Sequence, residues 1–152
     1  MFNVVFVCTG NTCRSSMAEG LAKSIAANLG DRAGHLNFNS AGVAAFPGMP
    51  ASSQAIQALQ EKKIDLAQHR ATLLNQDMVE SADLILVMTK GHKQTIAQKR
   101  PDLMDKVYLL TEYVLNAEVD VQDPFGQSVA VYRDCANQLE NLILGLVQKL
   151  GV

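Results

Sequence analysis

The sequence of 152 residues has no tryptophan, only three cysteines and only 18% charged residues. No apolar run approaches the roughly 18 residues of a membrane span, and the N-terminus MFNVVFVC lacks the basic region and cleavage site of a secretory signal. Lys and Arg number 13 against 15 Asp and Glu, a net charge of −2. This balance excludes the basic surface that nucleic acids and anionic membranes require, so we expect neither partner. An odd cysteine count without an export signal indicates a cytoplasmic protein.

The residues that are present indicate one globular domain, residues 1–152, because no linker, repeat or low-complexity segment divides the chain. Continuous apolar runs at 3–8 and 83–88 are typical of strands buried on both faces. Two further strands are expected at 36–40 and 106–110, and amphipathic helices at 15–29, 52–63, 91–99 and 129–150. This alternation predicts the α/β class: a doubly wound, four-stranded parallel sheet with helices on both faces. Ligands of such sheets bind beyond the carboxyl ends of the strands.

The loop after the first strand reads CTGNTCRS and has the pattern C-x5-R-S between a strand and a helix. Free backbone N–H groups and the helix dipole at such a helix start form an anion site suited to phosphate. Gly10 and Asn11 tolerate left-handed backbone angles, and Arg14 can fork two donors onto phosphate oxygens. We therefore predict a phosphate-binding loop made of Thr9, Gly10, Asn11, Thr12, Cys13, Arg14 and Ser15 after Cys8.

Cys8 is the candidate nucleophile, because the positive field of this loop favours a thiolate aimed at the bound phosphoryl group. Ser15 could either cap the following helix or donate its hydroxyl to the Cys8 sulfur. The plainer interpretation is a buried cysteine at the end of a strand, followed by a capped helix. The order of strand, cysteine, glycine, arginine and helix start favours the catalytic interpretation.

The segment CTGNTCRSSMAEGL resembles the signature of the low-molecular-weight protein tyrosine phosphatases, and the similarity extends over essentially the whole chain. Three distant segments also match that family: Ser40-Ala41-Gly42, His69-Arg70-Ala71 and Asp123-Pro124-Phe125-Gly126. One departure is Ser16, where the family usually has proline. Proline is favoured at the first position of a helix, so this change affects the helix start and not the chemistry.

Departure of the leaving group requires a general acid, and attack by water requires a base. The resemblance assigns both roles to Asp123, which without it would read as a turn residue before the last helix. Asp120 is the fallback, although a solvated loop charge is its simpler interpretation. Catalysis by Cys8, Arg14 and Asp123 through a phosphocysteine needs no metal or other cofactor, and the three histidines lack ligand spacing.

The resemblance implies supporting roles for further residues. His69 and Ser40 would hold the loop through Asn11, although His69 could equally be a surface histidine. Cys13 would form a reversible disulfide with Cys8 that protects it from over-oxidation, the alternative being an inert thiol. Two groups carry no role in this interpretation: His35 and His92, expected to face solvent, and Cys135, expected in the core.

The substrate is expected to be a phosphorylated protein, and the enzyme a monomer. Thr12 stands where tyrosine phosphatases of this family carry a bulky aliphatic residue, and its hydroxyl could accept a hydrogen bond from a guanidinium. Phe46 and Phe125 could stack on that cation as cleft walls, or be ordinary hydrophobic contacts. CTGNTCRS with DPFG resembles the bacterial protein arginine phosphatases, so we expect phosphoarginine hydrolysis, with phosphotyrosine as the alternative.

Two other classes fit the sequence less well. Thioredoxin-coupled arsenate reductases share the expected fold, but they need a further pair of cysteines near the middle of the chain. No cysteine lies between Cys13 and Cys135. An inactive phosphate-binding module would not need Cys8, Arg14 and Asp123 together.

Overall fold

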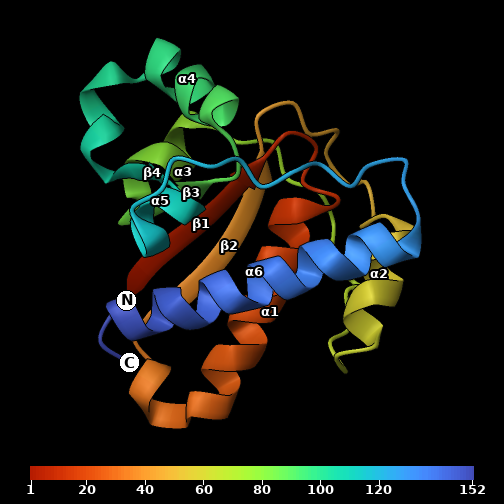
Figure 1. Ribbon diagram of the computed structural model, residues 1–152. Helices are drawn as coiled ribbons and strands as arrows, with labels where there is room; N and C mark the ends of the chain where they lie inside the picture. Colours follow the sequence, from red (N-terminus) through yellow and green to blue (C-terminus); the bar gives the residue numbers. More distant parts are fainter.

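The computed structural model describes residues 1–152 and contains one four-stranded, all-parallel sheet with helices on both faces (Figure 1). The strand order is β2-β1-β3-β4, with β1 at Phe2–Cys8, β2 at Leu36–Gly42, β3 at Leu84–Val87 and β4 at Val107–Leu109. The predicted fold class is confirmed. Strand β2 is two residues longer than expected, because Ala41 and Gly42 continue its pairing with Val7 and Cys8.

The expected helices are all present, with small changes at their ends: α1 at Arg14–Leu29, α2 at Ser53–Gln60, α4 at Lys90–Lys99 and α6 at Val129–Lys149. The sequence did not predict the short helices α3 at Gln76–Ser81 and α5 at Leu110–Leu115, or the 3-10 turns at Gly30–Ala33 and Pro101–Lys106. Fewer than two helical turns are too short to show a helical period. No helix of the chain combines the length and apolar character that a membrane crossing requires.

The side chains of β1 alternate between two hydrophobic cores, as a strand covered on both faces must. Val4, Phe6 and Cys8 belong to the larger core, which α1 and α6 cover. Val5 and Val7 belong to the smaller core, to which α3 and α4 contribute one side chain each. In Figure 1 the blue α6 and the orange α1 lie on one side of the sheet and the green α4 on the other. Cys8 therefore ends its strand facing the α1 side.

Candidate active site

The loop between β1 and α1 wraps around the Cys8 sulfur, which is almost fully buried. The Asn11 N–H donates to Cys8 Sγ at 3.3 Å, and Ser15 Oγ lies 2.9 Å from the same sulfur. Ser15 does not cap α1, whose N-cap residue is Cys13. Donors directed at sulfur stabilise its anionic form over the thiol. The geometry therefore matches the second of the two roles expected for Ser15.

Asn11 is the structural centre of the loop, with a left-handed φ of 58° and no exposed surface. Its Nδ2 donates to Ser15 Oγ at 2.8 Å and to Ser40 Oγ at 2.9 Å, and its Oδ1 accepts the Thr72 N–H at 2.9 Å. Because both hydroxyls accept from Asn11, each keeps its own proton to donate. Ser40 directs its proton to Glu19. The Ser15 proton has two acceptors in reach, the Cys8 sulfur at 2.9 Å and the Ala41 carbonyl at 3.4 Å, and the sulfur is the nearer.

The predicted support residues His69 and Ser40 both contact Asn11 in the structure. His69 Nε2 lies 2.7 Å from the Asn11 carbonyl oxygen, so this nitrogen carries the proton. No sequence pattern indicated Glu19 and Thr72 as members of the same network, since their contacts span 21 and 61 residues of chain. A fully satisfied buried network of this kind holds one loop conformation.

Gly42 permits the close approach of β2 to this loop. A Cβ atom at Gly42 would lie 2.4 Å from the Thr9 carbonyl oxygen and 2.9 Å from the Asn11 nitrogen, both of them backbone atoms that cannot rotate away. The neighbouring Val43 N–H donates to the Cys8 carbonyl at 2.9 Å. The close approach of the two backbones explains why the segment Ser40-Ala41-Gly42 ends in glycine: any larger residue at position 42 would collide with the loop.

Arg14 begins α1 and is buried, with 5% of its surface exposed. Its Nη1 donates to the Val121 carbonyl at 3.0 Å, and its Nη2 lies 3.6 Å from Asp123 Oδ2. Its Nε is buried without a hydrogen-bond partner in the protein. The guanidinium is thus fixed at one end, and its Nε and Nη2 present the edge that can fork onto a phosphate.

Asp123 comes from the loop before α6 and lies beside Arg14, although 109 positions of sequence separate them. Its side chain is half-exposed, and its Oδ1 accepts the Phe125 N–H at 3.0 Å in a tight turn. The fallback residue, Asp120, instead accepts the Lys90 N–H at 2.9 Å and so is engaged at the start of α4. Arg14, Asp120 and Asp123 line one open hollow of about 670 Å³. Of the two candidate acids, Asp123 is the one that contacts Arg14.

Phe46 and Phe125 are largely exposed, at 76% and 71% of their surface, so neither is an ordinary buried contact. Thr12, the third residue predicted to set selectivity, is half-buried, and its hydroxyl has only a 3.7 Å contact with Cys13 Sγ. The Thr12 hydroxyl therefore has no strong hydrogen-bond partner in the protein, and the rings of Phe46 and Phe125 are exposed. Their role in selectivity stays a prediction.

All three cysteines are free and buried. Cys13 Sγ lies 3.2 Å from the Tyr132 hydroxyl and 3.7 Å from Ser52 Oγ, two contacts that the sequence did not indicate. Cys135 lies in the core on α6 as predicted, and burial raises the pKa of its thiol to about 12. Cys135 is therefore a protonated core residue near neutral pH.

The prediction that His92 faces solvent is wrong, whereas His35 is exposed as expected. Only 5% of the His92 surface is exposed, because it shares the inward face of α4 with Ile96, one helical turn later. Its Nε2 lies 2.8 Å from Thr9 Oγ1 in the loop between β1 and α1. Burial, and secondarily the Arg14 charge, lower the pKa of His92 to about 4 against the opposing effect of nearby aspartates.

This lowered pKa predicts that acid destabilises the protein through His92. The unfolded chain takes up a proton on this ring near its ordinary pKa of 6.5 and the folded chain only near 4, so between these values the unfolded state binds more protons. Stability should fall by about 1–2 kcal/mol through this group between about pH 7.5 and pH 5. Urea unfolding at both pH values should show a correspondingly smaller loss in His92→Gln. Equal losses of unfolding free energy in the wild type and in His92→Gln would show that His92 is not the source of the acid sensitivity.

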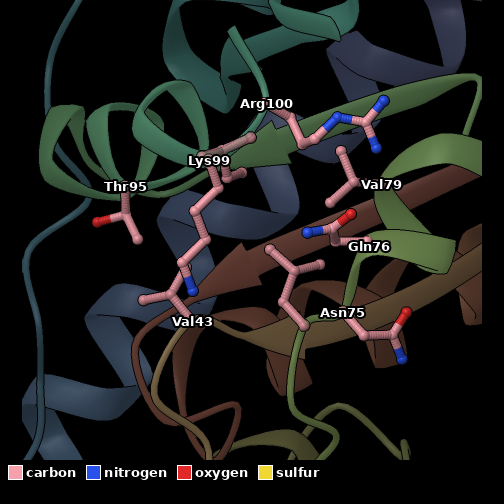
Figure 2. Close-up of a pocket in the computed structure, with 9 residues that line it drawn as sticks. Val43, Asn75, Gln76, Val79, Thr95, Lys99 and Arg100 are labelled. Atoms are coloured by element: carbon pink, nitrogen blue, oxygen red, sulfur yellow. The ribbon is translucent and has the colours of Figure 1, made fainter.

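A separate hollow of about 300 Å³ lies between α4, α3 and the end of β2 (Figure 2). Its lining includes Val43, Val79 and Ile96, with Lys99 and Arg100 among its polar residues. None of the predicted site residues lines it. No group of three or more metal-ligating side chains gathers anywhere in the chain.

Comparison with known proteins agrees with this geometry. Residues 3–152 match the family described as low molecular weight phosphotyrosine protein phosphatase. A protein-arginine-phosphatase of Bacillus subtilis (strain 168) is 47% identical, over 97% of this chain and 96% of that protein. A low molecular weight protein-tyrosine-phosphatase, PtpB of Staphylococcus haemolyticus (strain JCSC1435), is 36% identical over 92% of this chain and 94% of its own.

Among solved structures, a mutant YwlE arginine phosphatase with a phosphorylated active-site serine superposes with a TM-score of 0.93. It is 45% identical and covers 99% of this chain and 96% of its own. These matches confirm the resemblance found in the loop sequence. The chain belongs to the low molecular weight phosphotyrosine protein phosphatase family.

Proposed function

We propose that this enzyme is a cysteine-dependent protein phosphatase that hydrolyses phosphoarginine in proteins. The observation that carries the proposal is the arrangement around Cys8: donors point at the sulfur, and Arg14 faces Asp123 across the mouth of the same loop. The similarity to a protein-arginine-phosphatase supports the choice of substrate.

In the first step the Cys8 thiolate attacks phosphorus, an S–P bond forms and the P–N bond of phosphoarginine breaks. Asp123, in its acid form, gives its proton to the departing guanidine nitrogen. The loop N–H groups and the Arg14 Nε and Nη2 donors hold the equatorial oxygens, where charge develops. Arg14 is already fixed by the Val121 carbonyl, so this alignment costs little reorganisation.

In the second step Asp123, now a carboxylate, takes a proton from water as the water oxygen attacks the phosphocysteine. The S–P bond breaks, and the products are inorganic phosphate and the Cys8 thiolate. The Ser15 hydroxyl, which accepts from Asn11 and lies closer to the Cys8 sulfur than to the Ala41 carbonyl, donates its proton to the departing sulfur and stabilises it. The chain itself thus supplies nucleophile, acid, base and phosphate ligands.

Selectivity for phosphoarginine is proposed to arise at Thr12. Its hydroxyl has no strong partner in the protein and can accept a hydrogen bond from a guanidinium N–H. The exposed faces of Phe46 and Phe125 can stack on the planar cation. Phosphotyrosine is the alternative substrate, favoured by the similarity to a protein-tyrosine-phosphatase.

Replacing Thr12 by isoleucine should shift selectivity toward phosphotyrosine. The change removes the acceptor for the guanidinium and adds an apolar wall that suits a phenol ring. We expect the ratio of kcat/KM for phosphoarginine to that for phosphotyrosine to fall about 10- to 100-fold. The measurement is phosphate release from matched peptides that differ only in the phosphorylated residue.

Thr95→Ile is the matched control, because this threonine is on α4 and its hydroxyl donates within the helix. It should leave the ratio unchanged. Greater efficiency of the wild-type enzyme on phosphotyrosine would reject the arginine preference, and an unchanged ratio in Thr12→Ile would reject the role of the hydroxyl.

A redox role for Cys13 is a further part of the proposal. Peroxide would oxidise the Cys8 thiolate to a sulfenic acid, and the Cys13 thiol would condense with it, releasing water and forming a disulfide. The two cysteines lie five positions apart in the sequence, at the two ends of the loop between β1 and α1. The reductase alternative lacks the additional cysteine pair, and the remaining cysteine, Cys135, is a buried core residue.

A further inference from the structure

The start of α4 contacts the loop that carries the nucleophile. His92, the third residue of α4, reaches Thr9, which follows Cys8 directly in the chain. Thr89 caps the helix by accepting the His92 N–H at 3.2 Å, so the ring projects from an ordered first turn. A nearly fully buried side chain thus makes a contact across 83 positions of sequence.

The same end of α4 also holds the loop that carries Asp123. The Lys90 N–H donates to Asp120 Oδ1 at 2.9 Å. One residue on, the Val121 N–H donates to the Met88 carbonyl at 2.8 Å, just before α4. The Val121 carbonyl in turn accepts from Arg14. The nucleophile loop and the acid loop are therefore attached to one rigid element within a few residues of each other.

The chemical state of His92 suits a fixed, uncharged contact. Its Nδ1 is buried without a partner, so a proton there would leave a buried N–H without an acceptor. Placing the single proton of the neutral ring on Nε2 avoids this cost and makes Nε2 the donor to Thr9 Oγ1. A charged ring would instead put a second cation near Arg14.

We propose that His92 is a positioning residue of the phosphatase reaction: its neutral ring ties Thr9 to the start of α4 and thereby fixes the nucleophile loop relative to the acid loop. His92 does not contact the phosphoryl group in this account and acts through Thr9. The inference rests on the proposed function, because positioning has a kinetic consequence only if Cys8 and Asp123 act on the same phosphoryl group.

The test is a double-mutant cycle on this contact. His92→Leu removes the donor at similar volume, and Thr9→Val removes the acceptor at the same shape. Each should lower kcat about 5- to 10-fold at saturating substrate. The double variant should lose about as much as either single variant, because both changes remove the same contact. His92→Gln, which restores an N–H donor, should recover activity to within about twofold of wild type.

The matched control is His35→Leu, which replaces an exposed histidine outside the site and should leave kcat unchanged. A structural role alone would lower the unfolding midpoint without giving non-additive kcat values or rescue by glutamine. Wild-type kcat in both single variants would overturn the proposal. A double variant whose fold-loss in kcat equals the product of the two single losses would also overturn it.

A second readout separates this proposal from the proposed function. Iodoacetate alkylates a thiolate with loss of iodide, and its carboxylate is attracted to the same anion site, so the rate of Cys8 carboxymethylation reports loop geometry without turnover. His92→Leu and Thr9→Val should both slow this reaction about 5- to 10-fold, and inorganic phosphate should protect the wild type. An enzyme inactive on every phosphopeptide would reject the proposed function, whereas unchanged alkylation in both variants would reject the role of His92.

Discussion

Replacing Cys8 by serine is expected to lower kcat/KM for a phosphoarginine peptide by at least about 10⁴-fold. The Asn11 N–H and the Ser15 hydroxyl meet at the Cys8 sulfur, where they are placed to stabilise the charge of an attacking thiolate. A serine hydroxyl is a weaker nucleophile and a poorer leaving group than a thiolate, and the two groups that contact this side chain, an N–H and a hydroxyl, cannot act as a base for it. Attack on phosphorus and release of the phosphoryl group should therefore both slow. Initial rates of phosphate release at peptide concentrations well below KM measure the loss.

Cys135→Ala is the matched control, since it removes a thiol from the core of α6 without touching the loop. It should keep kcat/KM within about threefold of wild type where both proteins remain folded. Retention of more than a tenth of wild-type activity in Cys8→Ser would contradict the assignment of the nucleophile.

Replacing Arg14 by lysine should lower kcat/KM about 10³-fold, even though the positive charge is kept. Three nitrogens of the guanidinium have separate positions: Nη1 donates to the Val121 carbonyl, Nη2 faces Asp123, and Nε is buried without a partner in the protein. An ammonium group offers one point charge and cannot bridge these positions with fixed geometry.

Arg133→Lys provides the comparison, because Arg133 is an exposed residue near the start of α6 and is paired with Glu61, not with Asp123. Its kcat/KM should equal that of the wild type. If the kcat/KM of Arg14→Lys fell no more than about threefold, charge alone would explain the role of Arg14. The proposed pair of hydrogen bonds from its guanidinium to phosphate would then be wrong.

The sequence was sufficient to predict the sheet, its parallel pairing and the position of the loop. Residues 3–8 and 83–88 are apolar at five of their six positions each, a pattern typical of a strand covered on both faces. The pattern C-x5-R-S then placed Cys8 at the carboxyl end of such a strand. These features depend on residues that are close together in the sequence, so local patterns are enough to predict them.

The network around Asn11 could be predicted only in part. The resemblance indicated His69 and Ser40, whereas the Glu19 and Thr72 contacts depend on how β2 and the segment after it pack against the loop. No local pattern encodes which backbone N–H will meet the Asn11 side chain. Close packing, as at Gly42, decides these partners.

His92 shows why charge and polarity alone misplace a residue. A histidine near the start of a polar helix was expected to face solvent, but the i, i+4 relation to Ile96 places both on the buried face of α4. That spacing was visible in the sequence and would have indicated burial. Its partner, Thr9, could not be predicted, because the contact joins the loop after β1 to the helix after β3 and depends on the pairing of those two strands.

The formation of a phosphocysteine is tested most directly by trapping it in Asp123→Asn. With 4-nitrophenyl phosphate the leaving phenolate needs no proton, so the first step should proceed while the second lacks its base and slows about 10²- to 10⁴-fold. Rapid acid quench and mass spectrometry of the tryptic fragment 1–14 should find one phosphoryl group, on Cys8 and not on Cys13. A burst of nitrophenol without that adduct, or with the phosphoryl group on any other side chain, would contradict the mechanism.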